Sequence, residues 1–263
     1  MRTKLVAGNW KMNLTAAQGA ALVESFAKQV AVRYDVDVVV CPSFLSIPKV
    51  RDTVRHQGIL IGAQDVFWKD EGAFTGQVSA KQLAEQSVAF CIVGHSETRG
   101  RFGKLETPES TVPFFAETDE TVNLKIERLL FHGITPILCV GETLAEREAG
   151  TTDQIIEGQL RAALAGRDAS ELYGLVIAYE PVWAIGTGQT CAADEAERIC
   201  RFIRSVVEAL ADNEVAIHVR ILYGGSVKAD NAKELFSKPN IDGGLVGGAS
   251  LDAAGFAAII MSA

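Results

Sequence analysis

The sequence lacks any long apolar segment, although 48% of its 263 residues are hydrophobic. No run approaches the roughly 18 apolar residues that a membrane-spanning helix needs. The opening residues MRTKLVAGNWK also contain no apolar stretch of the kind found in a secretory signal. We therefore expect no membrane partner. The chain is long and apolar enough for one domain with a large core, and we expect that domain to span 1–263.

Paired cysteines are also missing. The five cysteines show no C-x-x-C spacing, and three of them (Cys41, Cys91 and Cys139) fall within strand-like runs. Free thiols in such runs are ordinarily buried. This usage predicts a reduced, cytoplasmic protein.

Basic residues are fewer than acidic ones, 25 against 33, so the formal net charge is −8. That balance argues against a nucleic-acid surface. It also repels anionic ligands at long range, so a phosphate could bind only through local donors.

Common cofactor and nucleophile motifs are absent as well. Residues 186–191 lack the third glycine of a dinucleotide fingerprint and do not open a first strand–helix–strand unit. Gly103-Lys104 is followed by Leu105, so it is not a P-loop. The chain has no HExxH motif, no Cys/His cluster and no nucleophile elbow. We therefore expect neither a metal nor a cofactor.

Short β-branched runs alternate along the chain with longer amphipathic segments. The runs are apolar throughout, as is typical of parallel strands that are buried on both faces. Apolar stripes with helical spacing occur at Leu22, Val23, Phe26 and Val30, and at Ile199, Phe202, Ile203, Val206 and Leu210. Eight such alternations in about 250 residues predict a single (β/α)₈ barrel. The predicted strands are Leu5–Asn9, Val36–Cys41, Leu60–Ala63, Ala89–Val93, Thr135–Val140, Leu175–Tyr179, Val219–Tyr223 and Ile241–Val246.

One stretch breaks this rhythm. About a dozen residues around 104–116 resemble a loop insertion, with two prolines and an adjacent Phe114-Phe115 pair. Loops this long are usually functional or mobile. We expect an exposed excursion that docks through its phenylalanines.

The segment YEPVWAIGTG places a carboxylate beside a hinged flap. Glu180 directly follows an apolar strand-like run, and Pro181 restricts the backbone after it. The apolar residues 182–185 then lead to Gly186, Thr187 and Gly188. Such a flap can close over a small polar ligand and exclude water. The alternative is a structural glutamate before an ordinary loop.

Other polar residues also follow strand-like runs. Asn9 and Lys11 offer an amide and an ammonium group that could hold a phosphate or stabilise an oxyanion. His95 precedes Ser96-Glu97, which we interpret as a helix start, and a helix N-terminus disfavours protonation of a nearby imidazole. Glu97 is either a capping carboxylate or a partner for Lys11. Taken singly, the lysine could be a surface charge and the histidine a core residue.

Paired glycines end the last two strand-like runs. Gly224-Gly225 precedes Ser226, and Gly247-Gly248 opens a short helix whose N–H groups point outward. Gly186 adds an amide once the flap closes. Barrels often bind phosphate through the loops after strands seven and eight. Ordinary glycine turns are the alternative for either loop alone.

Seven segments together identify a family. They are AGNWKMN (7–13), GAFTG (72–76), VGHSE (93–97), CVGETLAEREAG (139–150), YEPVWAIGTG (179–188), YGGS (223–226) and DGGLVGGASL (242–251). In order and spacing they resemble the triosephosphate isomerase family over nearly the whole chain. The resemblance implies interconversion of D-glyceraldehyde 3-phosphate and dihydroxyacetone phosphate, without cofactor or metal. It implies Glu180 as base and a neutral His95, with Asn9 and Lys11, as electrophile, a division of roles for which this family is itself the standard example.

The resemblance also implies a homodimer in which the GAFTG loop enters the neighbouring subunit and Thr75 braces its site. Here the chain departs from the family pattern. Gln77 stands where the family commonly has Glu, and Thr98 where it has Arg, so both partners of one interfacial ion pair are absent together. We therefore expect altered assembly and unaltered chemistry. Two alternatives stay open, namely an isomerase for a tetrose phosphate and a barrel retained as a non-catalytic binding protein.

Overall fold

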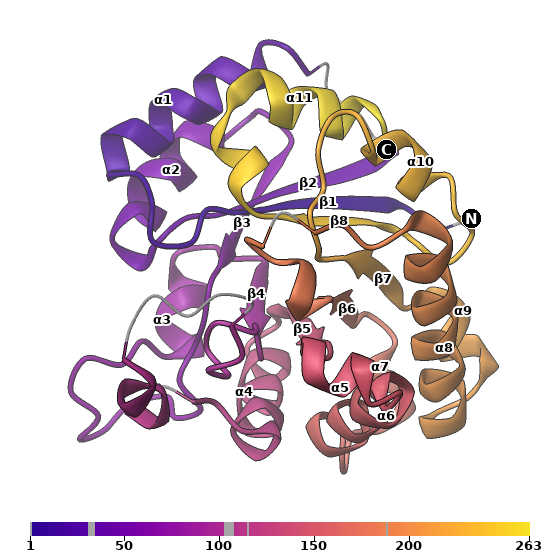
Figure 1. Cartoon of the computed structure of the whole chain (residues 1–263). Helices are drawn as coiled ribbons and strands as arrows, with labels where there is room; N and C mark the ends of the chain where they lie inside the picture. Colours follow the sequence, from indigo (N-terminus) through magenta and orange to yellow (C-terminus); the bar gives the residue numbers. More distant parts are fainter. Residues whose placement is uncertain (1, 31–34, 103–107, 115, 188) are drawn as a thin grey trace.

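Eight parallel strands close into a barrel in which each strand pairs with the next and β1 pairs with β8 (Figure 1). The computed structural model describes all residues except 1, 31–34, 103–107, 115 and 188. The predicted (β/α)₈ barrel is confirmed, and all eight predicted strands exist with bounds shifted by at most two residues. The strands are β1 Lys4–Asn9, β2 Val36–Cys41, β3 Ile59–Ala63, β4 Phe90–Val93, β5 Thr135–Val140, β6 Val176–Tyr179, β7 Arg220–Tyr223 and β8 Gly243–Val246.

Helices surround this barrel. The α-helices are α1 Ala16–Ala27, α2 Ile47–Val54, α3 Ala80–Glu85, α4 Asp119–Phe131, α5 Leu144–Glu148, α6 Thr152–Ala163, α7 Ala169–Leu172, α8 Ala193–Leu210, α9 Asn213–His218, α10 Ala232–Phe236 and α11 Ala253–Met261. Short 3₁₀ helices are η1 Phe44–Ser46, η2 Glu109–Phe114, η3 Val182–Ala184 and η4 Gly248–Leu251. The described residues include no helix long and apolar enough to cross a membrane.

Local sequence explains several helix ends. Thr15 and Gln18 form a reciprocal capping box at the start of α1, and Thr143 and Glu146 form another at α5. The predicted stripe on α8 is confirmed, since Ile199, Ile203 and Val206 are buried. The stripe on α1 ends early, because Val30 lies beyond the last residue of that helix.

The core has two layers, and strand alternation decides which residue enters which. Inside the barrel lie Leu5, Ala7, Val39, Cys41, Phe90, Ile92, Ile137, Cys139, Val176, Ala178, Leu222 and Leu245. The intervening strand residues pack outward against the helices. Continuing the inward set by two residues past Ala7, Ala178 and Leu245 reaches Asn9, Glu180 and Gly247. Alternation therefore places three predicted site residues over the barrel interior.

The proposed insertion is described only in part. Residues 108–114 include the 3₁₀ helix η2, and residues 108–110 are exposed, as predicted. Val112 packs against Gly100. A Cβ added at Gly100 would lie 2.5 Å from the Val112 side chain. The Phe114-Phe115 pair, on which the docking prediction depends, lies outside the described residues and side chains.

Candidate active site

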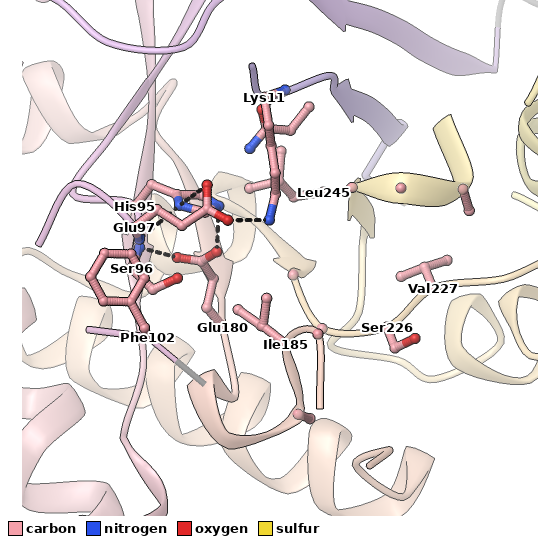
Figure 2. Close-up of a pocket in the computed structure, with 18 of the residues that line it drawn as sticks. Lys11, His95, Ser96, Glu97, Phe102, Glu180, Ile185, Ser226, Val227 and Leu245 are labelled. Atoms are coloured by element: carbon pink, nitrogen blue, oxygen red, sulfur yellow. Dashed lines mark hydrogen bonds and ion pairs between the residues drawn. The ribbon is translucent and has the colours of Figure 1, made fainter. Parts of the chain in front are cut away.

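The carboxyl ends of the strands bring the predicted polar residues to one side of the barrel. Figure 2 shows Lys11 from the loop after β1, His95 and Glu97 from the loop after β4, and Glu180 after β6 converging on one another. Ser226, after β7, lies across the cavity from them. The strand ends predicted from sequence therefore form one site.

The loop after β1 holds Lys11 in an unusual backbone conformation. Lys11 has φ +52°, in the left-handed region that most non-glycine residues avoid. The Asn9 side chain accepts a hydrogen bond from the Lys11 N–H (3.1 Å), and Gln64 donates to the Lys11 carbonyl (2.8 Å). These bonds stabilise the strained residue. Its Nζ then lies 2.5 Å from Glu97 Oε1, as one of the two alternatives for Glu97 predicted.

His95 lies in a tight turn rather than before a helix. The Arg99 N–H donates to the His95 carbonyl (2.9 Å), and the Arg101 N–H then donates to the Ser96 carbonyl (2.8 Å), which ends the turn. No α-helix begins at Ser96 or Glu97, and α4 starts only at Asp119. The predicted helix start is therefore wrong, and with it the helix-terminus explanation for a neutral His95. Because the chain turns back at Arg101, a helical ladder cannot continue.

Glu180 is almost fully buried, with 2% of its surface exposed. Its Oε1 lies 2.9 Å from His95 Nε2, and its Oε2 accepts a hydrogen bond from the Ser96 N–H (2.9 Å; Figure 2). Gly141 of the neighbouring loop permits this placement, because a Cβ there would lie 1.7 Å from the Glu180 carbonyl oxygen. The base candidate is thus held against the histidine in this structure.

The charges of this pair are set by burial and by each other. Burial is the largest single influence on Glu180 and raises its pKa, but His95, the Ser96 N–H and Lys11 together lower it below its ordinary value. Burial likewise lowers the pKa of His95, but Glu180 and Glu97 together raise it above its ordinary value. Glu180 is therefore an ionised carboxylate.

A backbone contact selects the tautomer of the imidazole. The Glu97 N–H donates to His95 Nδ1 over 3.1 Å, so Nδ1 serves as acceptor. In the neutral ring the proton then resides on Nε2, which faces Glu180 and the cavity. The turn thus replaces the predicted helix as the feature that presents a donor from His95.

The flap from Pro181 to Thr187 has a well-defined anchor at its first turn. Residues 182–184 form η3, and Trp183 Nε1 donates to Glu142 Oε1 over 2.8 Å. Glu142 is fully buried, accepts a second bond from Tyr179, and its burial raises its pKa. Arg147 lies over the Trp183 ring at 4.5 Å. At the other end Gly186 is exposed with φ +70°.

Glycines shape the two loops on the far side of the cavity. A Cβ on Gly225 would lie 2.2 Å from the Tyr223 hydroxyl, so only glycine fits there without a shift. Gly248 begins η4, the predicted short helix, and α11 follows. Backbone N–H groups at such a start bind anions well.

These elements enclose a cavity of about 990 Å³. All predicted residues but one line it, namely Asn9, Lys11, His95, Glu97, Glu180, Gly186, Ser226, Gly247 and Gly248. Thr75 lies instead on an exposed loop and does not line the cavity. The volume is at the upper end for small-molecule sites.

Sequence reasoning missed two residues that hold these groups in place. Gln64 donates to the carbonyls of Lys11 and Cys41 (both 2.8 Å), and Glu142 anchors the flap. Gln64 directly follows one predicted strand, and Glu142 is the second residue after another. Several other site residues were found at such positions. That position was the available signal.

A buried carboxylate beside an imidazole, a lysine and two glycine-rich loops meet at the carboxyl end of a (β/α)₈ barrel, the end at which barrel enzymes carry their active sites. A family model described as triosephosphate isomerase matches residues 4–263. The chain is 45% identical over 260 residues to the triosephosphate isomerase of Citrifermentans bemidjiense (99% and 98% of the two chains), and 47% to that of Trichlorobacter lovleyi with the same coverage. It is 48% identical over 265 residues to that of Synechococcus sp. (99% and 95%). The chain therefore belongs to the triosephosphate isomerase family.

Proposed function

We propose that Glu180, His95, Lys11 and Asn9 carry out the interconversion of D-glyceraldehyde 3-phosphate and dihydroxyacetone phosphate in this chain. The observation that supports this most directly is the contact between an ionised, buried Glu180 and the Nε2 of His95, opposite Lys11 in one cavity. An aldose–ketose isomerisation needs one base and donors for two oxygens, and this cavity supplies both.

The reaction moves one proton between two carbons. Glu180 removes a proton from the carbon beside the carbonyl, and the electron pair of that C–H bond forms an enediolate. His95 gives its Nε2 proton to the former carbonyl oxygen and takes the hydroxyl proton from the other oxygen, so a second proton moves between the two oxygens. Lys11 stabilises the developing negative charge. Protonated Glu180 then returns its proton to the neighbouring carbon, so no atom is gained or lost.

Substrate binding changes the electrostatics of the pair. A substrate between Glu180 and His95 would separate them, which removes the largest of the interactions that raise the pKa of His95 and leaves the smaller one from Glu97. Burial, which lowers that pKa, remains. The ring is then a neutral donor, and Glu180 loses its strongest cationic partner and becomes a better base.

The flap protects the intermediate. An enediolate phosphate exposed to water can expel its phosphate group, and closure of residues 181–187 would suppress this loss. Gly186 N–H would then join Ser226, Gly247 and Gly248 around the phosphate. Crystals grown with and without a phosphate ligand should show two flap positions, and a single position free of lattice contacts would contradict the idea.

We further infer a homodimer. Large apolar side chains are exposed on the loops after the first three strands, with Met12 97%, Leu45 93% and Phe74 41% exposed. Thr75 lies on the same exposed loop as Phe74. A second copy would cover these residues and bring Thr75 to the neighbour's site. Sedimentation should therefore give twice the monomer mass, and a monomer that is fully active would contradict this role for Thr75.

The departures at Gln77 and Thr98 fit a changed interface. Gln77 is exposed, whereas the Thr98 hydroxyl lies 2.9 Å from both Glu117 Oε2 and the His95 carbonyl. Thr98 thus serves the His95 turn within its own chain. A contribution of the 104–116 insertion to the interface stays a prediction.

The other proposals concern the setting of the chain. We propose one domain over 1–263, because β1 and β8 pair to close the barrel. A cytoplasmic location is also proposed, since Cys41, Cys91, Cys139, Cys191 and Cys200 are free and buried. The tetrose phosphate and binding-protein alternatives are not favoured by the family assignment.

A coupled assay with both triose phosphates and a tetrose phosphate tests the function. We expect kcat/KM to be highest for the triose phosphates, and no turnover of them would overturn the proposal. Lys11→Met should abolish detectable binding of a phosphorylated transition-state mimic with little change in Tm. Tight binding of the mimic by this variant would contradict the role of Lys11.

A further inference from the structure

Among the described residues that line the cavity are three lysines and arginines, and two of these are already paired. Lys11 Nζ lies 2.5 Å from Glu97, and Arg101 forms an ion pair with Glu146. The third, Lys228, is exposed, and its ammonium has no ion pair with any part of the chain that the structure describes. Lys228 is therefore the lining cation whose charge is not offset locally.

The backbone of Lys228 is fixed although its side chain is free. The Lys228 N–H donates to Asn231 Oδ1 (2.8 Å), and Asn231 Nδ2 donates to the Ser226 carbonyl (2.9 Å). The Lys228 carbonyl accepts from the Ala232 N–H at 3.0 Å, where α10 begins. Lys228 is thus held two residues beyond Ser226, at the loop proposed to bind phosphate.

The charge of the whole chain makes such a cation useful. The net charge is −8, and the lining carboxylate Glu180 is paired only with an imidazole, which can lose its charge. Both would repel a phosphate dianion before it reaches the cavity. Because Glu97 offsets the charge of Lys11 in the empty site, attraction must come from a cation that is not so paired.

We infer that Lys228 is a further specificity-determining residue, whose free ammonium draws the substrate phosphate into the cavity and favours phosphorylated over unphosphorylated substrates. This inference rests on the proposed function. Lys228 acts before the chemical step, because it does not contact Glu180 or His95. Its contribution should therefore appear in kcat/KM more than in kcat.

The test compares Lys228→Gln with a matched control, Lys233→Gln, at low and at physiological ionic strength. Lys233 is exposed on α10 and does not line the cavity. At low salt we expect Lys228→Gln to lower kcat/KM for D-glyceraldehyde 3-phosphate by about 3- to 10-fold, the low end for electrostatic steering. Lys228→Glu should lower it further. Both losses should shrink near 0.15 M salt, where the Debye length is about 8 Å.

Unphosphorylated D-glyceraldehyde supplies the internal control. Its kcat/KM should be the same in wild type and Lys228→Gln, since it carries no charge to attract. Lys233→Gln should change kcat/KM less than about 2-fold for both substrates. The Kd of inorganic phosphate, measured by calorimetry at low salt, should rise in Lys228→Gln and stay unchanged in the control Lys233→Gln.

Each contrary outcome has a definite meaning. Unchanged kcat/KM for the phosphorylated substrate, equal losses in the two lysine variants, or an equal loss with D-glyceraldehyde would overturn the role of Lys228. A wild-type protein without triose phosphate turnover would instead refute the proposed function. Phosphate affinity would then still report whether Lys228 attracts the anion.

Discussion

Two carboxylates, Glu180 and Asp242, are equally buried at opposite ends of the barrel, with 2% and 3% of their surfaces exposed. Asp242 precedes β8 and accepts from Arg2 (2.6 Å), Arg204 (2.8 Å) and the Ile221 N–H (2.9 Å). Glu180 follows β6 and contacts one imidazole and one amide. Asp242 is therefore locked between two permanent cations, whereas Glu180 has a partner that can lose its charge.

Burial alone therefore does not distinguish Glu180, the proposed base, from the structural carboxylate Asp242. The permanence of the countercharge does. It also fits the general division of a barrel, in which the carboxyl ends of the strands carry chemistry and the amino ends carry stability.

The largest effect should come from Glu180→Gln. The amide keeps the shape of the side chain but cannot accept a proton, so kcat should fall by at least ~10²-fold, the low end for general base catalysis. A steady-state assay on the two triose phosphates measures this, and a variant within a few-fold of wild type would remove Glu180 from its assigned role.

Asp242→Asn should show the opposite pattern. The change leaves Arg2 and Arg204 without their counter-charge, and the free energy of unfolding should fall by about 2–3 kcal/mol. That is less than the roughly 3–5 kcal/mol expected for a fully buried pair, because both guanidinium groups keep some contact with solvent. Denaturant titration measures the loss. If kcat per folded molecule also fell tenfold, stability at one end of the barrel and chemistry at the other would not be independent.

The pH dependence of stability should sharpen the comparison. Because the pKa of Glu180 is lowered on folding, its contribution is present above its ordinary value of 4.5 and is lost as the pH falls further through the lowered pKa. The raised pKa of His95 adds stability that is present below 6.5 and is lost as the pH rises through that raised value.

Subtracting the Glu180→Gln curve from the wild-type curve isolates this pair. The difference in unfolding free energy should be greatest between about pH 4.5 and 6.5 and smaller on either side. A difference that is constant with pH would show that the Glu180–His95 contact carries no charge in the empty site.

Glu142→Gln should have the smallest effect. The amide still offers an oxygen to Trp183 but loses the negative charge near Arg147, whose Nη1 lies 3.6 Å from Glu142. We expect kcat to fall by less than about 10-fold and stability to change by about 1 kcal/mol. Enzyme kinetics and thermal melting measure both. A kcat loss as great as that of Glu180→Gln would place Glu142 in the chemistry itself.

Much of this site could be predicted from sequence, because residues that directly follow the strands of a parallel barrel all lie at the same end of it. Asn9, Glu180 and Gly247 each continue the inward alternation of a strand, so finding the strand finds the residue. His95 also follows a strand, but it continues the outward-facing Cys91 and Val93 rather than the inward set, and the setting of its side chain was not predicted. The residue types Ser96 and Glu97 are typical of a helix start. They do not indicate that the Arg101 N–H bonds to the Ser96 carbonyl and forms a turn instead.

Two contacts between loops distant in sequence were not predicted, unlike that of Lys11 with Glu97. Gln64 reaches the Lys11 carbonyl over 53 residues, and Glu142 reaches Trp183 over 41. Their side chains carry no periodicity, and only the closed barrel brings them together. The attraction assigned to Lys228 likewise depends on which neighbouring charges are already paired.

The pairing of β1 with β8 has a consequence for synthesis of the chain. Lys4–Asn9 is made before every other strand of the barrel, yet its partner strand Gly243–Val246 is made after all the others. Until then the nascent chain presents two unpaired, apolar strand edges, which are prone to aggregation. Asn9 and Lys11 can meet Gly247 in one cavity only after all eight strands have been made. Products truncated before β8 should therefore depend on chaperones and lack activity altogether.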